Sequence, residues 1–215
     1  MHTLIKICGL TEPAEAAIVN ENDVDLAGNV LFFEKSRRNI DIRQARRIHA
    51  ELKQEIKKVA VVVSPTIDHL LQIEEAGFDL VQIHGELPDW EQLLERTRIQ
   101  LLLAYNQLDV QLPDDALQME RIEGFLFDAA CPGSGQVFDW NVLADLMQSG
   151  QIPGQKPVFL AGGLTPENVA GAMRIVGPAG VDVSSGVEYA DRQGKDPAAI
   201  RRFAAAVRRA DAQKR

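Results

Sequence analysis

The chain has 215 residues, of which 46% are hydrophobic and 25% charged, a composition typical of a globular protein large enough for a sizeable core. Its formal net charge of −8 argues against a dedicated nucleic-acid binder, which usually shows a basic excess, but allows a locally positive pocket for a small anion. The two cysteines, Cys8 and Cys131, form no C-x-x-C pair, which disfavours a structural zinc site and a disulfide framework.

Short apolar runs of β-type alternate with longer helical patterns along the whole chain. The expected strands are Leu4–Cys8, Asp25–Phe33, Val59–Val63, Asp79–Ile83, Ile99–Ala104, Gly124–Asp128, Pro157–Ala161 and Val181–Ser184. The expected helices are Glu12–Asn20, Ile42–Leu52, Ile67–Ala76, Trp90–Arg96, a short one at Asp114–Met119, Asn141–Gln148, Pro166–Val176 and Pro197–Ala210. Alternation of this kind indicates βα units around a parallel sheet.

Eight strands in a chain of this length predict a compact (β/α)₈ TIM barrel, an α/β fold. The rival is a doubly wound open sheet, which usually carries G-x-G-x-x-G after its first strand; here Cys8-Gly9-Leu10-Thr11 stands there instead. No linker or low-complexity segment divides the chain, so we expect a single barrel domain over 1–215. The polar residues Asp211 to Arg215 are expected to fray.

Polar side chains of one parity converge at the strand ends. Residues alternate between the two faces of a strand, and barrel enzymes place their chemistry at the C-terminal ends of the strands. Each such residue alone has an ordinary structural interpretation, but several at one rim favour a functional site. The set expected at the barrel mouth is Cys8, Gln82, His84, Asp128 and Asp182, with Lys6 one layer deeper, where it neutralises an inward aspartate.

Two glycine-containing turns follow successive strands near the C-terminus. In the first, Thr165 is a suitable N-cap and Pro166 a suitable first helical residue. Glycines let backbone N–H groups approach an anion closely, and phosphate at loops seven and eight is common in barrels. The residues expected to form this phosphate site are Gly162, Gly163, Ser184, Ser185 and Gly186.

The sequence combines a predicted phosphate site with a thiol and a carboxylate, and it has no metal or nucleotide motif. This combination favours proton transfer on a phosphosugar, that is, an isomerisation. We therefore expect no metal and no cofactor, and a small-molecule phosphosugar as the partner rather than nucleic acid. The N-terminus resembles no signal peptide and the apolar runs are too short to span a bilayer. We accordingly expect no membrane partner and a cytoplasmic location. As a separate expectation, the chain is a monomer or weak homodimer.

The same residues lie within short motifs that follow one another in a fixed order. These motifs are Lys6-Ile7-Cys8-Gly9-Leu10-Thr11, Lys35-Ser36-Arg37-Arg38, Val81-Gln82-Ile83-His84-Gly85, Phe125-Leu126-Phe127-Asp128, Gly133-Ser134-Gly135 with Phe138-Asp139-Trp140, Leu160-Ala161-Gly162-Gly163-Leu164, Gly180-Val181-Asp182-Val183-Ser184-Ser185-Gly186-Val187-Glu188 and Gly194-Lys195-Asp196. In this combination, across nearly the whole chain, the sequence resembles the phosphoribosylanthranilate isomerase family of tryptophan biosynthesis.

The resemblance implies a cofactor-free (β/α)₈ barrel that performs an Amadori rearrangement of N-(5′-phosphoribosyl)anthranilate to 1-(2-carboxyphenylamino)-1-deoxyribulose 5-phosphate. It implies that Asp128 is the general acid and Cys8 the general base. It also implies that Arg38 pairs with the anthranilate carboxylate, which suits the guanidinium fork. The other implied contacts are Gln82, His84 and Asp182 around the substrate, and Gly163, Ser184, Ser185 and Gly186 at the phosphate.

The sequence departs from the family pattern in three places. The family's Ser-Pro-Arg is Ser36-Arg37-Arg38 here, which leaves open which arginine meets the carboxylate. The family usually has a glycine where Gly28 or Asn29 stands, and the loop after Asp128 is shortened.

Two other functions are less consistent with these residues. A dual-substrate isomerase that also serves histidine biosynthesis would be expected to use aspartates as acid and base, and Cys8 speaks against it. A degenerate barrel that only binds a phosphosugar is disfavoured because both Cys8 and Asp128 are retained. We also expect no disulfide between Cys8 and Cys131, and an accessible, partly ionised Cys8 thiol.

Overall fold

The computed structural model describes residues 2–105, 120–128, 139–152 and 156–213. The short helix predicted at Asp114–Met119 and the residue Cys131 lie outside these ranges, so neither prediction is tested by the structure.

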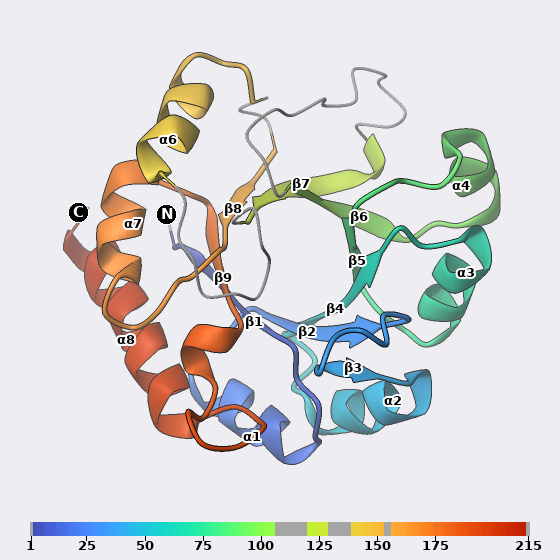
Figure 1. Cartoon of the computed structure of the whole chain (residues 1–215), viewed down its shortest axis with the longest axis horizontal. Coiled ribbons are helices and arrows are strands. Elements are labelled where there is room, and N and C mark those ends of the chain that lie inside the picture. Colours follow the sequence, from blue (N-terminus) through green and yellow to red (C-terminus); the bar gives the residue numbers. More distant parts are fainter. Residues whose placement is uncertain (1, 106–119, 129–138, 153–155, 214–215) are drawn as a thin grey trace.

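The sheet is a closed barrel of parallel strands. Its order is β1-β9-β8-β7-β6-β5-β4-β2-β3, and a further pairing of β1 with β2 closes the ring (Figure 1). The TIM barrel prediction is therefore confirmed, and the open sheet is excluded. The strands are β1 Leu4–Cys8, β2 Leu26–Leu31, β3 Asn39–Ile40, β4 Lys57–Val63, β5 Leu80–His84, β6 Gln100–Tyr105, β7 Ile122–Phe127, β8 Val158–Leu160 and β9 Gly180–Val183.

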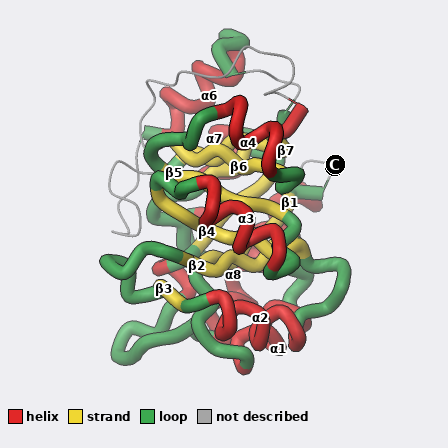
Figure 2. The backbone as a smooth tube through the Cα atoms, turned by 90° about the vertical axis from the view of Figure 1, so that its right-hand side faces the viewer, coloured by secondary structure: helices red, strands yellow, loops and turns green. Residues whose placement is uncertain are grey.

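The two-residue strand β3 was not predicted, and it pairs with the end of β2 through Val30 and Asn39. Helices surround the ring of strands, so the strands occupy the centre of the molecule (Figure 2). They are α1 Ala14–Glu21, α2 Ile42–Glu51, α3 Ile67–Glu75, α4 Trp90–Arg96, α6 Trp140–Gln148, α7 Val169–Val176 and α8 Pro197–Gln213, with a 3₁₀ helix η1 at Ser185–Val187.

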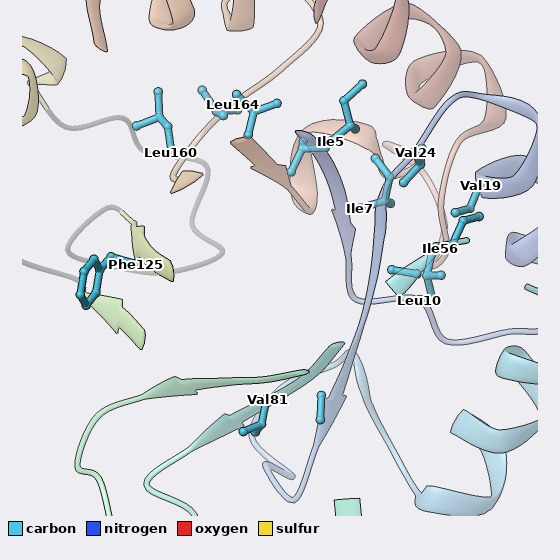
Figure 3. Close-up of a cluster of buried hydrophobic side chains, with 14 of the residues drawn as sticks. Ile5, Ile7, Leu10, Val19, Val24, Ile56, Val81, Phe125, Leu160 and Leu164 are labelled. Carbon is cyan, nitrogen blue, oxygen red and sulfur yellow. The ribbon is translucent and has the colours of Figure 1, made fainter. Parts of the chain in front are cut away.

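The period-two alternation of the strands separates two hydrophobic layers. Ile5 and Ile7 of β1 belong to the larger layer between strands and helices, and Figure 3 shows them with Val19 of α1 and Val24 close to Ile7. Cys8 belongs instead to the smaller layer inside the barrel, together with residues such as Leu126 of β7. The predicted parity is therefore confirmed, and the inward residues nearest the C-terminal ends are left to line a pocket.

The largest differences from the predicted helix boundaries are at the start of α7 and the end of α8. The helix predicted from Pro166 begins as a turn, and α7 starts at Val169 because Asn168 is drawn into the loop, where its side chain bonds Thr165 N at 2.8 Å and Gly163 O at 2.9 Å. At the other end, α8 continues to Gln213. Asp211 does not fray, because it accepts hydrogen bonds from the backbone N and the hydroxyl of Thr3.

None of the helices in the described ranges has both the length and the apolar character needed to cross a membrane.

Candidate active site

A pocket of about 390 Å3 opens at the C-terminal ends of the strands. It brings together the polar residues that were predicted at the barrel mouth, and it adds residues from the loops after β2 and β9. The polar and thiol side chains that line it are Cys8, Ser36, Arg38, Gln82, His84, Asp128, Asp182 and Ser184.

Lys6 lies one residue deeper on β1 and is fully buried. Its Nζ is 2.8 Å from Oδ1 of Asp182, whose position on β9 is directly opposite in the strand register. Burial opposes the charge on Lys6, but Asp182 and Cys8 outweigh it and raise the Lys6 pKa. The predicted neutralisation of an inward aspartate is confirmed, and the pair places a permanent cation beneath the thiol.

Cys8 is the last residue of β1 and is 7% exposed. Burial raises the pKa of its thiol above the ordinary value, and the charges of Lys6 and Lys195 lower it only in part. Cys8 lines the pocket, as expected of an accessible thiol, but burial works against the expected partial ionisation, because desolvation disfavours the thiolate more than the two lysines favour it. Burial thus favours the protonated form of the residue that the family resemblance implies as the base.

Gly28 pairs with Cys8 across the β1–β2 register. A Cβ at this position would lie 3.1 Å from Lys6 Nζ and 3.3 Å from Cys8 Sγ, so a side chain here would crowd both groups. The next residue, Asn29, is buried and donates from its amide to Leu10 O at 2.9 Å. Between the two alignments left open, the geometry favours Gly28 as the position that requires glycine.

Gln82 and His84 lie two residues apart on β5, both buried and on the inner face. The amide Nε2 of Gln82 donates to Nε2 of His84 at 2.8 Å. Gln82 Oε1 is buried and has no hydrogen-bond partner among the described residues. A buried acceptor without a partner is uncommon, and a hydroxyl of a bound sugar would satisfy it.

Asp128 follows the last residue of β7 and is half-buried. Its backbone N–H donates to Tyr105 O at 2.9 Å. This hydrogen bond extends the β6–β7 pairing by one residue and holds the backbone of Asp128 in place. In the barrel order β7 is separated from β1 by β8 and β9. Asp128 and Cys8 therefore face the pocket from different parts of its rim. This arrangement suits an acid and a base that act on different atoms of one substrate.

The loop after β2 presents its two arginines differently. The Arg38 side chain is 14% exposed and lines the pocket, whereas that of Arg37 is 66% exposed. The stem of Arg38 crosses Gly9, where a Cβ would lie 2.5 Å from Arg38 Cδ. Gly9 also has a φ of +79°, so any side chain there would be strained. The geometry favours Arg38 over Arg37 as the cation of the pocket.

The two glycine-containing turns meet in space. Gly162 and Gly163 have φ of +81° and +63° after β8. Gly186 in η1 approaches so closely that a Cβ there would lie 2.0 Å from Leu164 O. The Ser184 hydroxyl donates to Cys8 O at 3.0 Å, which connects this region to β1. The structure therefore brings the predicted phosphate residues together, with Ser185 in η1 between Ser184 and Gly186.

Three charged residues near the site had no role in the sequence interpretation: Glu188, Lys195 and Glu15. Lys195 is 2% exposed, and its Nζ bonds Ser184 O at 3.1 Å and Glu188 Oε1 at 3.0 Å. Buried Glu15 accepts from Lys195 N at 2.7 Å and from Thr11 N at 2.6 Å, which connects the loops after β1 and before α8. Glu188 and Lys195 stand within the quoted motifs, but no local pattern predicts that Glu188, 150 positions along the chain, contacts Arg38.

No group of three or more His, Cys, Asp and Glu side chains in the described ranges could hold a metal ion. A larger hollow of about 730 Å3 lies beside α2 and is lined by residues such as Arg43 and Arg47. It contains none of the predicted site residues.

Comparison with known proteins gives a consistent result. The family model for N-(5′-phosphoribosyl)anthranilate isomerase matches residues 5–206. The N-(5′-phosphoribosyl)anthranilate isomerase of Streptococcus mutans is 36% identical over 209 residues, which cover 96% of this chain and 100% of that protein. The enzyme of the same name from Neisseria meningitidis serogroup C is 37% identical over 210 residues, covering 95% and 96% of the two chains.

Solved structures agree with these relatives. The crystal structure of phosphoribosyl anthranilate isomerase from Thermotoga maritima superposes with a TM-score of 0.78 at 32% identity, covering 96% of this chain and 98% of that one. A phosphoribosyl anthranilate isomerase in complex with reduced 1-(o-carboxyphenylamino)-1-deoxyribulose 5-phosphate superposes with a TM-score of 0.73 at 31% identity, with coverage of 96% and 98%.

Proposed function

Because the chain belongs to the N-(5′-phosphoribosyl)anthranilate isomerase family, we propose that Cys8 and Asp128 perform the proton transfers of that isomerisation in the pocket at the barrel mouth. The chain is an intramolecular isomerase of tryptophan biosynthesis, which converts N-(5′-phosphoribosyl)anthranilate to 1-(2-carboxyphenylamino)-1-deoxyribulose 5-phosphate. The observation that supports the residue roles is the pocket itself, which combines a thiol, a carboxylate and an arginine with the glycine–serine turns close by.

Asp128 is the proposed general acid. It protonates the ribose ring oxygen, so that the ring opens and the nitrogen–carbon bond becomes a Schiff base. The half-buried position of Asp128 at the end of β7 allows it to reach a substrate in the pocket. A carboxyl group positioned at the leaving oxygen lowers the barrier because a proton moves onto that oxygen as its bond to carbon breaks.

Cys8 is the proposed general base. It removes the proton from C2′ of the Schiff base, and the resulting enolamine becomes the ketone by tautomerisation. Since burial raises its pKa, the thiol must first lose its proton, and the thiolate is then favoured by the neighbouring charges of Lys6 and Lys195. These two lysines compensate for part of the desolvation that the buried position imposes on a negative sulfur.

The remaining predicted residues are proposed to bind the substrate. Gly162, Gly163, Ser184, Ser185 and Gly186 hold the phosphate, where the two turns meet. Arg38 pairs with the anthranilate carboxylate. The acceptor Oε1 of Gln82, which lacks a partner among the described residues, receives a hydrogen bond from a sugar hydroxyl, with His84 and Asp182 beside it.

We also propose that the enzyme works in the cytoplasm as a monomer or weak homodimer. One structure from Thermotoga maritima is described as monomers generated from a dimeric phosphoribosylanthranilate isomerase, so that relative is dimeric and can be obtained as a monomer. Light scattering coupled to size exclusion, over a range of protein concentrations, measures which state this chain adopts.

The function is tested with freshly prepared phosphoribosylanthranilate by following the loss of anthranilate-type fluorescence. The wild-type protein is expected to turn the substrate over and to restore growth of a tryptophan auxotroph that lacks this step. A barrel that binds but does not turn over the substrate would contradict the proposal.

Arg38→Met is expected to weaken substrate binding by roughly 2–5 kcal/mol, because it removes the partner of a desolvated carboxylate. Arg37→Met serves as the matched control, since its side chain is 66% exposed, and is expected to have a much smaller effect. Steady-state kinetics of both variants give the comparison through KM. A larger increase in KM for Arg37→Met than for Arg38→Met would show that Arg37 binds the anthranilate carboxylate.

Gly186→Ala is expected to raise KM strongly, because a Cβ there would lie 2.0 Å from Leu164 O and the phosphate turn would have to shift. Gly171→Ala in α7 is the control, since a Cβ at that position meets nothing within 4 Å. The Ki of inorganic phosphate, measured for both variants, reports on the phosphate site alone. An unchanged Ki in Gly186→Ala would exclude this turn from phosphate binding.

A further inference from the structure

Glu188 is a carboxylate beside the pocket that the reaction itself does not use. It follows η1 directly, and its side chain is 9% exposed. Its Oε1 accepts from Arg38 Nε at 2.5 Å and from Lys195 Nζ at 3.0 Å. Its Oε2 accepts from Arg38 Nη2 at 3.0 Å and from Nη2 of Arg37. One nearly buried carboxylate therefore holds three cations, and the cluster keeps an excess of positive charge.

The geometry of Arg38 shows what Glu188 does to it. A guanidinium group offers two forks of N–H donors, one along the Nε–Nη2 edge and one along the Nη1–Nη2 edge. Glu188 engages the Nε–Nη2 edge, and the stem of Arg38 lies against Gly9. With one edge and the stem held, Arg38 lines the pocket in a defined orientation. Its Nη1 makes no hydrogen bond to any described residue, so the second fork can bind another carboxylate.

Glu188 also connects the two ends of the site. Through Lys195 Nζ it reaches Ser184, whose backbone O and hydroxyl lie 3.1 and 3.3 Å from that nitrogen. Ser184 stands at the start of the phosphate turn, while Arg38 belongs to the loop after β2. The side chain of Glu188 thus connects the turn proposed to bind the substrate phosphate with the arginine proposed to bind the substrate carboxylate.

We propose that Glu188 is a positioning residue: it orients Arg38 so that the enzyme selects substrates that carry a carboxylate on the aromatic ring. This inference rests on the proposed function, because it assumes that Arg38 meets that carboxylate. The opposite role would be competition, in which Glu188 occupies Arg38 until the substrate displaces it. Positioning predicts weaker binding of a carboxylated ligand when Glu188 is neutralised, and competition predicts tighter binding.

The test compares two stable ligands that differ only in the carboxylate: reduced 1-(2-carboxyphenylamino)-1-deoxyribulose 5-phosphate and its phenylamino counterpart. Titration calorimetry gives Kd for both with wild-type enzyme, Glu188→Gln and Asp191→Asn. The last variant removes one negative charge from an exposed residue of the same segment. We expect Glu188→Gln to raise the Kd of the carboxylated ligand about tenfold and that of the phenylamino ligand less than about twofold, with Asp191→Asn resembling wild type.

Two further variants separate positioning from general damage. Glu188→Asp retains the charge but shortens the reach, so it is expected to lose part of the discrimination between the ligands, and it provides the measurement if Glu188→Gln does not fold. In an Arg38→Met background, Glu188→Gln is expected to cause no further loss of discrimination, since residues that act through one another are not additive.

An unchanged ratio of the two Kd values in both Glu188 variants, or tighter binding of the carboxylated ligand, would overturn the positioning role. Failure of the proposed function looks different. In that case the wild-type protein itself would not turn over phosphoribosylanthranilate, whatever the ratio of the two Kd values.

Discussion

Asp128→Asn is expected to lower kcat by about 10²–10⁴-fold, the usual cost of removing a general acid. The amide has the shape of the carboxyl group but has no proton to give to the ring oxygen, so ring opening becomes the slow step. Binding is expected to change little, because neither the phosphate turns nor Arg38 is altered. Rapid-mixing measurements of a single turnover, followed by fluorescence, report the chemical step directly.

The control for this variant is Asp145→Asn, which makes the same chemical change at an exposed position on α6. It is expected to keep wild-type kcat. The Kd of the reduced product analogue, measured for both variants, separates chemistry from binding. A kcat near that of the wild type in Asp128→Asn would remove Asp128 from the role of acid and leave ring opening to another group of the pocket.

The barrel and the inward-facing set were predictable because they follow from local geometry. The period of two along a strand is independent of the rest of the chain, so the same alternation repeated in several strands, with Ile5 and Ile7 opposite Cys8 on β1 as one case, indicated the two faces. The same argument placed Gln82 and His84 on the inner face of β5. That Lys6 neutralises an inward aspartate was also predictable, because an inward lysine requires a nearby anion; the strand register identifies this aspartate as Asp182.

The parts that were not predicted depend on contacts between distant segments. Glu188 meets Arg38 only because the barrel closes and brings the loop after β2 beside η1. The start of α7 shifted because the Asn168 side chain bonds into its own loop, and several N-cap positions compete in such a segment. The protonation state of Cys8 depends on burial, which the sequence motif does not reveal.

Cys8→Ser is expected to lower kcat by about 10²–10⁴-fold as well, because a serine hydroxyl is a far weaker acid than a thiol and cannot supply the anionic base. Cys131→Ser, the only other cysteine replacement that the chain allows, is the control and is expected to leave turnover unchanged. Full turnover in Cys8→Ser would exclude Cys8 as the base.

The reactivity of Cys8 tests the same assignment without changing the enzyme. Because burial raises the thiol pKa, the thiolate fraction is small at neutral pH and grows about tenfold with each pH unit below that pKa. Both kcat/KM and the rate of inactivation by iodoacetamide are therefore expected to rise as the pH increases from 7 to 9. A product analogue in the pocket is expected to protect the enzyme, and Cys131→Ser is expected to be inactivated like the wild type. Inactivation that is independent of pH, or that disappears in Cys131→Ser, would show that the reacting thiol is not the proposed base.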